Sequence, residues 1–109
     1  MIKKTFKTTV GAREFFDKHL KLTAIIKIEE ESTIHYLKDG YYHRLDGPAF
    51  ESEKGDFMWY KNGELHREDG PAYIKDDGSE TWFINGTEYT EEEFKTWQRS
   101  QKLERFLND

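Results

Sequence analysis

The sequence predicts an α+β fold in which an antiparallel β-meander of repeated hairpins is flanked by an N-terminal helix and a C-terminal helix. Two observations support this class: a motif that recurs every 23 residues, and a capping signal at the start of the last segment. The 109 residues suffice for one domain with one core. We expect a single domain, 1–109, made of a β-α-β flank (1–35), hairpin repeats (36–89) and a helix (90–109).

The N-terminal flank does not repeat. Residues 2–8 are typical of a strand, and Thr9 is suited to cap a short helix that runs to about Leu20. That helix would place four side chains near one face, namely Ala12, Phe16, His19 and Leu20. The β-branched run 22–28 predicts a buried strand, which a turn at 29–32 connects to a strand at 33–38. The helix is expected to lie across one face of the sheet.

The central segment repeats at an offset of 23 residues. Asp39-Gly40 aligns with Asn62-Gly63 and Asn85-Gly86, and Tyr36 aligns with Trp59 and Trp82. His43 aligns with His66 and then with Tyr89. Five further residues recur without change, as Arg44, Asp46, Gly47, Pro48 and Ala49 and then as Arg67, Asp69, Gly70, Pro71 and Ala72.

The glycine-containing turns predict a strand register. A two-residue loop at Asn62-Gly63 would pair Lys61 with Glu64, Tyr60 with Leu65 and Trp59 with His66. The equivalent turns would pair Tyr36 with His43 and Trp82 with Tyr89. Two-residue loops at Lys54-Gly55 and Asp77-Gly78 would pair Phe50 with Trp59 and Tyr73 with Trp82. Two aromatic rows across the sheet are then expected, Phe50-Trp59-His66 and Tyr73-Trp82-Tyr89.

The connection between hairpins carries the sequence His-Arg-x-Asp-Gly-Pro-Ala. Asp-Gly marks a tight turn, and a proline can begin a strand where its missing donor is not needed. We expect Arg44 to reach Asp46, and Arg67 to reach Asp69, so that each pair closes its loop. These residues are therefore interpreted as structural.

The segment Trp59–Ala72 resembles the HRxDGPA variety of MORN-like repeat, which occurs in bacteriophage, giant-virus and bacterial proteins, including the antitoxin-like YwqK group. The resemblance covers residues 34–93. Arg and Asp here replace part of the glycine framework of ordinary MORN repeats. The resemblance implies a stack of β-hairpins, a phage or bacterial origin and no catalytic residues.

The C-terminal flank predicts a helix with two apolar sides. Thr90 and Glu93 form a capping box. At 100° per residue, Phe94 and Trp97 share one side, whereas three further apolar residues fall almost opposite, namely Leu103, Phe106 and Leu107. Either the helix breaks near Ser100-Gln101 and folds back on the core, or this second set faces a partner or another copy of the chain.

Composition and charge exclude several classes of function. No apolar run approaches 18 residues and no signal-peptide core is present, so membrane spans and export are not expected. The chain has no cysteine, which fits a reducing cytoplasm, the host's if a phage encodes the protein. Residues 36–89 carry 6 basic and 12 acidic side chains, a net charge of -6, which disfavours nucleic-acid binding.

No catalytic constellation or cofactor motif is apparent. His43 and His66 are equivalent positions on neighbouring hairpins, and packing or loop hydrogen bonding is favoured over metal binding there. We therefore expect no enzyme, no cofactor and no small-molecule substrate. The preferred hypothesis is a protein-binding module, such as a phage-encoded inhibitor or adaptor that occludes a host defence protein. The alternatives are a self-associating assembly domain and, less favoured, a single-stranded nucleic-acid binder.

Overall fold

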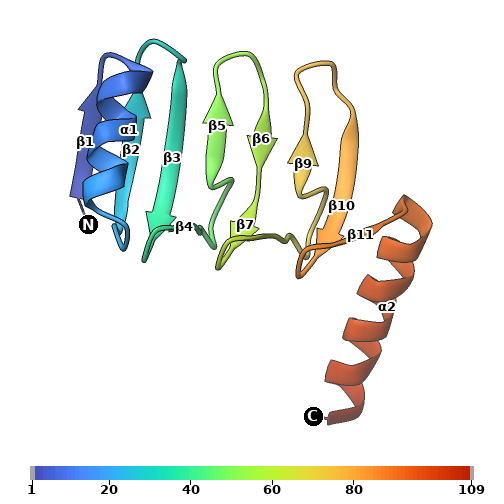
Figure 1. Ribbon diagram of the computed structural model, residues 1–109. Helices are drawn as coiled ribbons and strands as arrows, with labels where there is room; N and C mark the ends of the chain where they lie inside the picture. The colour runs from blue at the N-terminus through green and yellow to red at the C-terminus, as the bar shows by residue number, and fades with distance from the viewer. Residues whose placement is uncertain (1, 109) are drawn as a thin grey trace.

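The computed structural model describes residues 2–108 as a long, thin sheet with one helix at each end of the chain (Figure 1). Its dimensions are 50 × 32 × 18 Å. The elements in chain order are β1 (Ile2–Phe6), α1 (Thr9–Lys18), β2 (Ala24–Ile28), β3 (Thr33–Lys38), β4 (Tyr41–Tyr42), β5 (Phe50–Ser52), β6 (Phe57–Met58), β7 (Tyr60–Lys61), β8 (Glu64–Leu65), β9 (Tyr73–Ile74), β10 (Glu80–Ile84), β11 (Thr87–Tyr89) and α2 (Glu91–Asn108). The predicted α+β class is confirmed.

The main sheet is antiparallel except at its first pair of strands. Its order is β1-β2-β3-β5-β6-β9-β10-β11, with β4 paired to β3, while β7 and β8 form a ribbon of their own. β1 pairs with β2 in parallel. The meander therefore does not extend to β1, because the strand-helix-strand connection through α1 returns the chain in the same direction.

The turns at Asp39-Gly40, Asn62-Gly63 and Asn85-Gly86, which lie at the lower edge of the sheet in Figure 1 and are called the lower turns, have the predicted geometry. Asn62 has φ 50° and Gly63 has φ 83°, and the equivalent turns are nearly identical. Both central residues of a type I′ turn need positive φ, which Asn, Asp and Gly tolerate. The pairs Lys61–Glu64, Tyr60–Leu65 and Trp82–Tyr89 are confirmed. Trp59 and His66 face each other through the His66 amide, which donates to the Trp59 carbonyl.

The turns that contain Gly55 and Gly78, which lie at the upper edge of the sheet in Figure 1 and are called the upper turns, are one residue longer than predicted. Ser52 and Asp56 close the first loop through a backbone hydrogen bond of 2.9 Å, and Lys75 and Ser79 close the second at the same distance. Only the glycine of each loop, Gly55 or Gly78, has positive φ. Each is therefore a three-residue loop that ends in a left-handed glycine.

This extra residue shifts the register, so the two predicted aromatic rows are wrong. Phe50 pairs with Met58 rather than with Trp59, and Tyr73 pairs with Thr81 rather than with Trp82. A shift of one residue moves a side chain to the other face of a sheet. Trp59 and Phe57 therefore lie on the face opposite Phe50, with their ring centroids 6.5 Å apart.

One row of paired residues crosses the whole main sheet instead. Its members are directly opposed in successive strands from β1 to β10 and are Lys4, Ile26, His35, Phe50, Met58, Tyr73 and Thr81. Directly opposed residues project to the same face of a sheet. This row therefore defines one face of the molecule, and we call it the central row.

Successive repeats are joined by the same hydrogen bonds. The Gly63 amide donates to the Tyr42 carbonyl, and the Gly86 amide donates to the Leu65 carbonyl, both at 2.8 Å. The Arg44 and Arg67 amides donate to the carbonyls of Tyr60 and Phe83. The hairpins that carry the lower turns therefore lie side by side and repeat every 23 residues.

Helix α1 covers the first strands and closes the main core. Ala12 packs against the buried side chains of β2, with Phe15 and Phe16 beside it. Two sequence expectations are corrected. Thr8 rather than Thr9 caps α1, since its hydroxyl accepts from the Gly11 amide. Leu20 lies beyond the end of the helix and is exposed, because α1 ends at Lys18.

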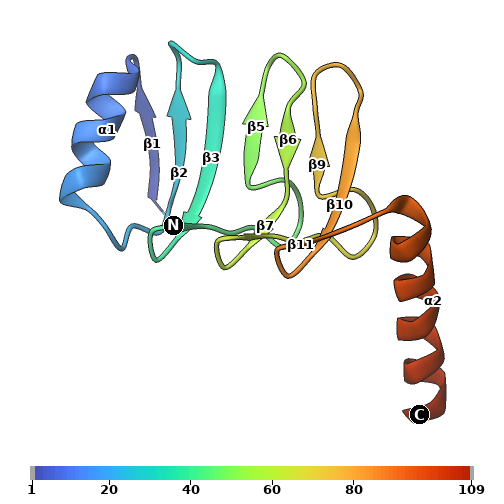
Figure 2. The ribbon, with the colours of Figure 1, turned by 45° about the vertical axis from the view of Figure 1, so that its right-hand side comes forward.

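Helix α2 begins at the predicted capping box. The Thr90 hydroxyl accepts from the Glu93 amide at 3.1 Å, and the Glu93 carboxylate accepts from the Thr90 amide at 2.9 Å. Phe94 is only 3% exposed and anchors α2 where it meets β10 and β11. The helix continues without a break to Asn108 and extends away from the sheet (Figures 1 and 2). Among residues 2–108, neither helix is long and apolar enough to cross a membrane.

Candidate functional site

The two loops that share the sequence His-Arg-x-Asp-Gly-Pro-Ala are built around stacked arginines. The guanidinium carbon of Arg67 lies 3.9 Å from the centroid of the Trp59 ring, and that of Arg44 lies 4.0 Å from the Tyr36 ring. Arg67 Nε donates to Asp69 at 2.8 Å, and Nη1 donates to the Pro71 carbonyl at 3.1 Å. The predicted loop-closing pairs are therefore present in both repeats.

The Arg44 loop repeats this arrangement with one further contact. Arg44 Nε donates to Asp46 at 2.9 Å, and Nη1 donates to the Pro48 carbonyl and to Glu51, both at 3.1 Å. Burial acts to lower the pKa of Arg44, but the hydrogen bond to Asp46 and the nearby acidic groups outweigh it and raise that pKa, while the same hydrogen bond lowers the pKa of Asp46. The guanidinium group is thus held by neighbours within its own repeat.

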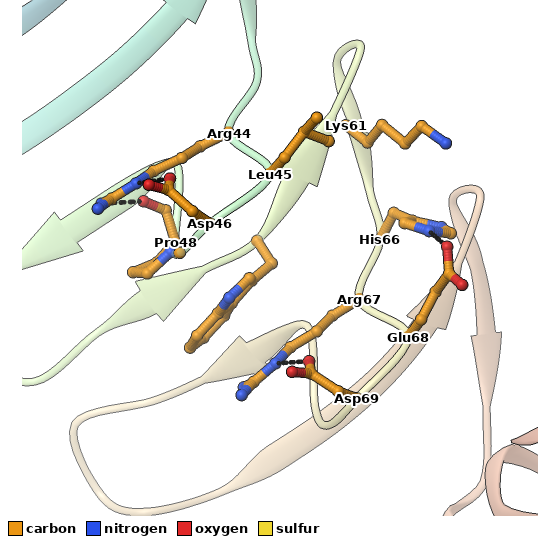
Figure 3. A pocket seen from close by; sticks show the side chains of 11 residues that line it. Arg44, Leu45, Asp46, Pro48, Lys61, His66, Arg67, Glu68 and Asp69 are labelled. Atoms are coloured by element: carbon orange, nitrogen blue, oxygen red, sulfur yellow. Dashed lines mark hydrogen bonds and ion pairs between the residues drawn. The ribbon is translucent and has the colours of Figure 1, made fainter.

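A groove of about 680 Å³ lies between these two loops (Figure 3). Six of the sequence-predicted residues line it, namely Arg44, Asp46, Trp59, His66, Arg67 and Asp69. Figure 3 shows the polar groups paired with one another, Arg44 with Asp46, Arg67 with Asp69 and His66 with Glu68. Since these groups hold their own loops, the groove is a structural seam between repeats.

The repeated histidines each support the turn of the following repeat. His43 Nδ1 accepts from the Asn62 amide, and His66 Nδ1 accepts from the Asn85 amide, both at 2.9 Å. An accepting Nδ1 places the proton on Nε2, from which His66 donates to Glu68 at 2.9 Å. Within residues 2–108, no group of three or more histidines and carboxylates is arranged to hold a metal ion.

A buried hydrogen-bonded chain escaped the sequence reasoning. Thr33 bonds to Glu31 at 3.2 Å and to His35 Nε2 at 2.9 Å, and His35 Nδ1 bonds to the Tyr42 hydroxyl at 2.7 Å. A carboxylate only accepts, so Thr33 donates to Glu31, His35 Nε2 donates to Thr33, and Tyr42 donates to His35.

Burial controls the ionisation of this chain. It lowers the pKa of His35 below 6.5 in spite of the Glu31 carboxylate, which acts in the opposite direction. Burial also raises the pKa of Tyr42 to about 12, and Tyr60 and Glu31 add to that effect. A histidine held neutral and a tyrosine held protonated stabilise the fold, and neither is activated as a nucleophile. The sequence does contain a signal for this contact. The Asp39-Gly40 turn pairs Leu37 with Tyr42, and His35 lies two residues before Leu37 in the same strand, so it projects to the same face as Tyr42.

The apolar triplet of α2 lies far from the groove. Leu103, Phe106 and Leu107 are 58%, 78% and 70% exposed. They lie in the half of the helix that extends beyond the sheet (Figure 2). Trp82 also lies outside the groove, in β10. Of the two alternatives for α2, the break near Ser100 is wrong, and the triplet faces outward.

These features define a protein of stacked β-hairpin repeats with a helix at each end and an apolar triplet on the projecting helix. No family model matches the sequence, and no curated protein or solved structure is significantly similar to the chain.

Proposed function

We propose that this protein is a non-catalytic protein-binding module that binds its partner through the exposed half of α2. The observation that carries the proposal is the exposure of Leu103, Phe106 and Leu107 on an unbroken helix. Their spacing of i, i+3 and i+4 places them on one side of the helix. An amphipathic helix with this spacing is a common ligand for an apolar groove on another protein.

The energetics of burial favour this use of the triplet. Each of these side chains would stabilise a complex by about 1.5–3 kcal/mol on full burial, before ordering costs. The ordering cost is small here, because the anchored Phe94 and the capping box already hold the helix. A preformed helix loses less conformational entropy on binding than a segment that must fold.

The state of the polar groups supports a non-catalytic function. The arginines and histidines of the repeats are engaged in loop-closing and turn-supporting bonds. The buried His35 and the half-buried Tyr42 are bonded to each other and are held in their neutral forms. These residues therefore have structural functions that account for their positions.

The most specific form of the proposal is a phage-encoded inhibitor or adaptor that occludes a host defence protein in the cytoplasm. It rests on the resemblance of Trp59–Ala72 to MORN-like repeats of phage and bacterial proteins. An assembly domain that associates with itself is the second candidate, and the same exposed triplet favours it.

The test compares two triple-serine variants. One replaces Leu103, Phe106 and Leu107, and the matched control replaces three apolar residues of similar exposure elsewhere, Val10, Leu20 and Leu45, which are 67%, 77% and 78% exposed. Each tagged protein is used to capture partners from bacterial lysate, and the amount captured is quantified. The melting temperature of each variant is measured separately. We expect the α2 variant to lose its partners, the control to keep them, and both to melt close to the unchanged protein at a dilution where all three are monomeric. Equal capture by all three proteins, or a large loss of melting temperature in the α2 variant at that dilution, would contradict the proposal.

A further inference from the structure

The face of the sheet defined by the central row is covered over only part of its length. α1 lies over β1 and β2 on this face, where Ala12 packs against Ile26 (Figure 1). From β5 to β10 no helix lies over the same face (Figure 1). Phe50, Met58 and Tyr73 are each only half-buried there. We call this uncovered part, from Phe50 to Thr81 along the central row, the aromatic face.

The rings at the β5 end of this face contact one another, and at its β9 end the Lys75 ammonium lies 5.7 Å from the centroid of the Tyr73 ring. The Phe50 ring meets His35 edge-on at 5.2 Å and Tyr42 at 6.5 Å, and Tyr42 stacks on Tyr60 at 5.0 Å. The Tyr60 hydroxyl reaches the Met58 sulfur at 3.6 Å. An apolar sheet face is normally completed by a second layer of structure. α1 demonstrates that a helix with apolar side chains fits this face in its first strands.

In the described part of the chain, the exposed half of α2 packs against no other element, but it cannot reach the aromatic face of its own chain. Phe94 fixes the start of α2 beyond the last strands, and the helix then leaves the sheet (Figures 1 and 2). An unbroken helix cannot turn back over its own sheet. We propose that the exposed half of α2 packs on the aromatic face of a second copy of this chain, in the position that α1 occupies on the first strands.

Length and overall charge favour this pairing. Residues 99–108 span about 15 Å at 1.5 Å per residue, as do the ten residues of α1, and a five-residue strand such as β10 spans about 17 Å at 3.4 Å per residue. Residues 99–108 contain three basic side chains and one acidic side chain, a net charge of +2, whereas the repeats, 36–89, have a net charge of -6. Opposite charges favour this pairing and steer the encounter.

The area argues for a reciprocal dimer. The triplet alone offers roughly 400 Å², well below the roughly 800 Å² per partner of a stable interface. In a two-fold dimer each copy gives one helix and receives another, so each buries both its triplet and its aromatic face. Each copy then contributes two contact surfaces rather than one, so the buried area per copy exceeds that of the triplet alone.

This inference rests on the proposed binding through α2 and identifies the partner as a second copy. Its first test is the mass in solution, by light scattering over a range of protein concentrations. We expect twice the 13.1 kDa chain mass, and a monomer for the serine variant of Leu103, Phe106 and Leu107. Thr81→Lys places a positive charge on the aromatic face and should also give a monomer, whereas Thr81→Val should remain dimeric. The melting temperature of a dimer falls as the protein is diluted. The unchanged protein and the variants are therefore melted at a dilution where all are monomeric.

The second test locates the contact. A photo-crosslinking amino acid replaces Phe106, and, as a control on the opposite side of the same helix, Arg105. Equal amounts of ¹⁵N-labelled and unlabelled protein are mixed, so that peptides crosslinked between copies carry one label. We expect Phe106 crosslinks between copies in residues 50–83, and few from Arg105.

The outcomes separate this inference from the proposed function. A monomer at every concentration, or crosslinks that join α2 only to α2, overturns the aromatic face as the docking surface. If such a monomer still loses other captured proteins when the triplet is replaced, binding through α2 stands and only its partner is different. If replacing the triplet changes neither self-association nor capture, both proposals fail.

Discussion

Replacing Arg67 by alanine should reveal how the loop between repeats is held. Its guanidinium lies 3.9 Å from the Trp59 ring centroid and donates to the Pro71 carbonyl at 3.1 Å, with its side chain 22% exposed. A partly buried cation-π contact contributes about 1 kcal/mol, and a hydrogen bond from a charged donor contributes about 1.5 kcal/mol. The Asp69 side chain is 85% exposed, so its ion pair is well screened. We expect Arg67→Ala to lower the free energy of unfolding by about 2–3 kcal/mol.

Urea unfolding followed by tryptophan fluorescence measures this change. Asp69→Asn isolates the ion pair and should cost a small fraction of the Arg67→Ala loss, because the stacking and the Pro71 bond remain. Arg67→Lys keeps the charge but loses the planar group and should resemble alanine more than arginine. If Asp69→Asn destabilises the protein as much as Arg67→Ala does, the ion pair rather than the stack holds the loop.

Three further predictions concern the turns and the buried chain. Gly70→Ala should destabilise the protein in urea, because the new Cβ would lie 2.9 Å from the Arg67 guanidinium carbon; a neutral result would show that the arginine moves freely. Asn62→Ala should cost about 1 kcal/mol and Asn62→Gly little, because Asn62 has φ 50°; equal costs would contradict the turn geometry. The pKa of His35 is lowered in the folded protein, so the unfolded chain takes up a proton more readily and stability should fall as the pH drops below about 6.5. The difference between the unchanged protein and His35→Gln in unfolding free energy should shrink over that range, and a difference independent of pH would argue against the buried neutral imidazole.

The lower turns could be predicted because their geometry is decided locally. Asn62-Gly63 requires two residues that accept positive φ, and that requirement fixes both the loop length and the pairing of Lys61 with Glu64. The upper turns could not be predicted in the same way. Gly55 is compatible with both a two-residue and a three-residue loop, and the pairing of Phe50 with Met58 that distinguishes them is not encoded in the turn itself. One residue of difference then exchanged Met58 for Trp59 opposite Phe50.

The candidate site shows the same division between local and tertiary causes. The capping box and the two apolar sides of α2 follow from spacing alone, so the triplet could be named in advance. Whether the helix would break near Ser100 depends on packing with distant strands, which spacing does not reveal. The Thr33-His35-Tyr42 chain required combining strand alternation with the correctly predicted Asp39-Gly40 register.

The identical bonds between neighbouring repeats make the molecule extendable. Each 23-residue unit donates its Asn and Gly amides to the preceding unit and its Arg amide to the following unit, so every junction between units has the same three bonds. The series ends where Tyr89 and Thr90 replace His and Arg and α2 begins. Duplication of one unit would add a hairpin of two strands without any new type of contact, and would move the two terminal helices apart by about 10 Å. The number of repeats therefore sets the distance between the two terminal helices, and that distance can change only in steps of one repeat.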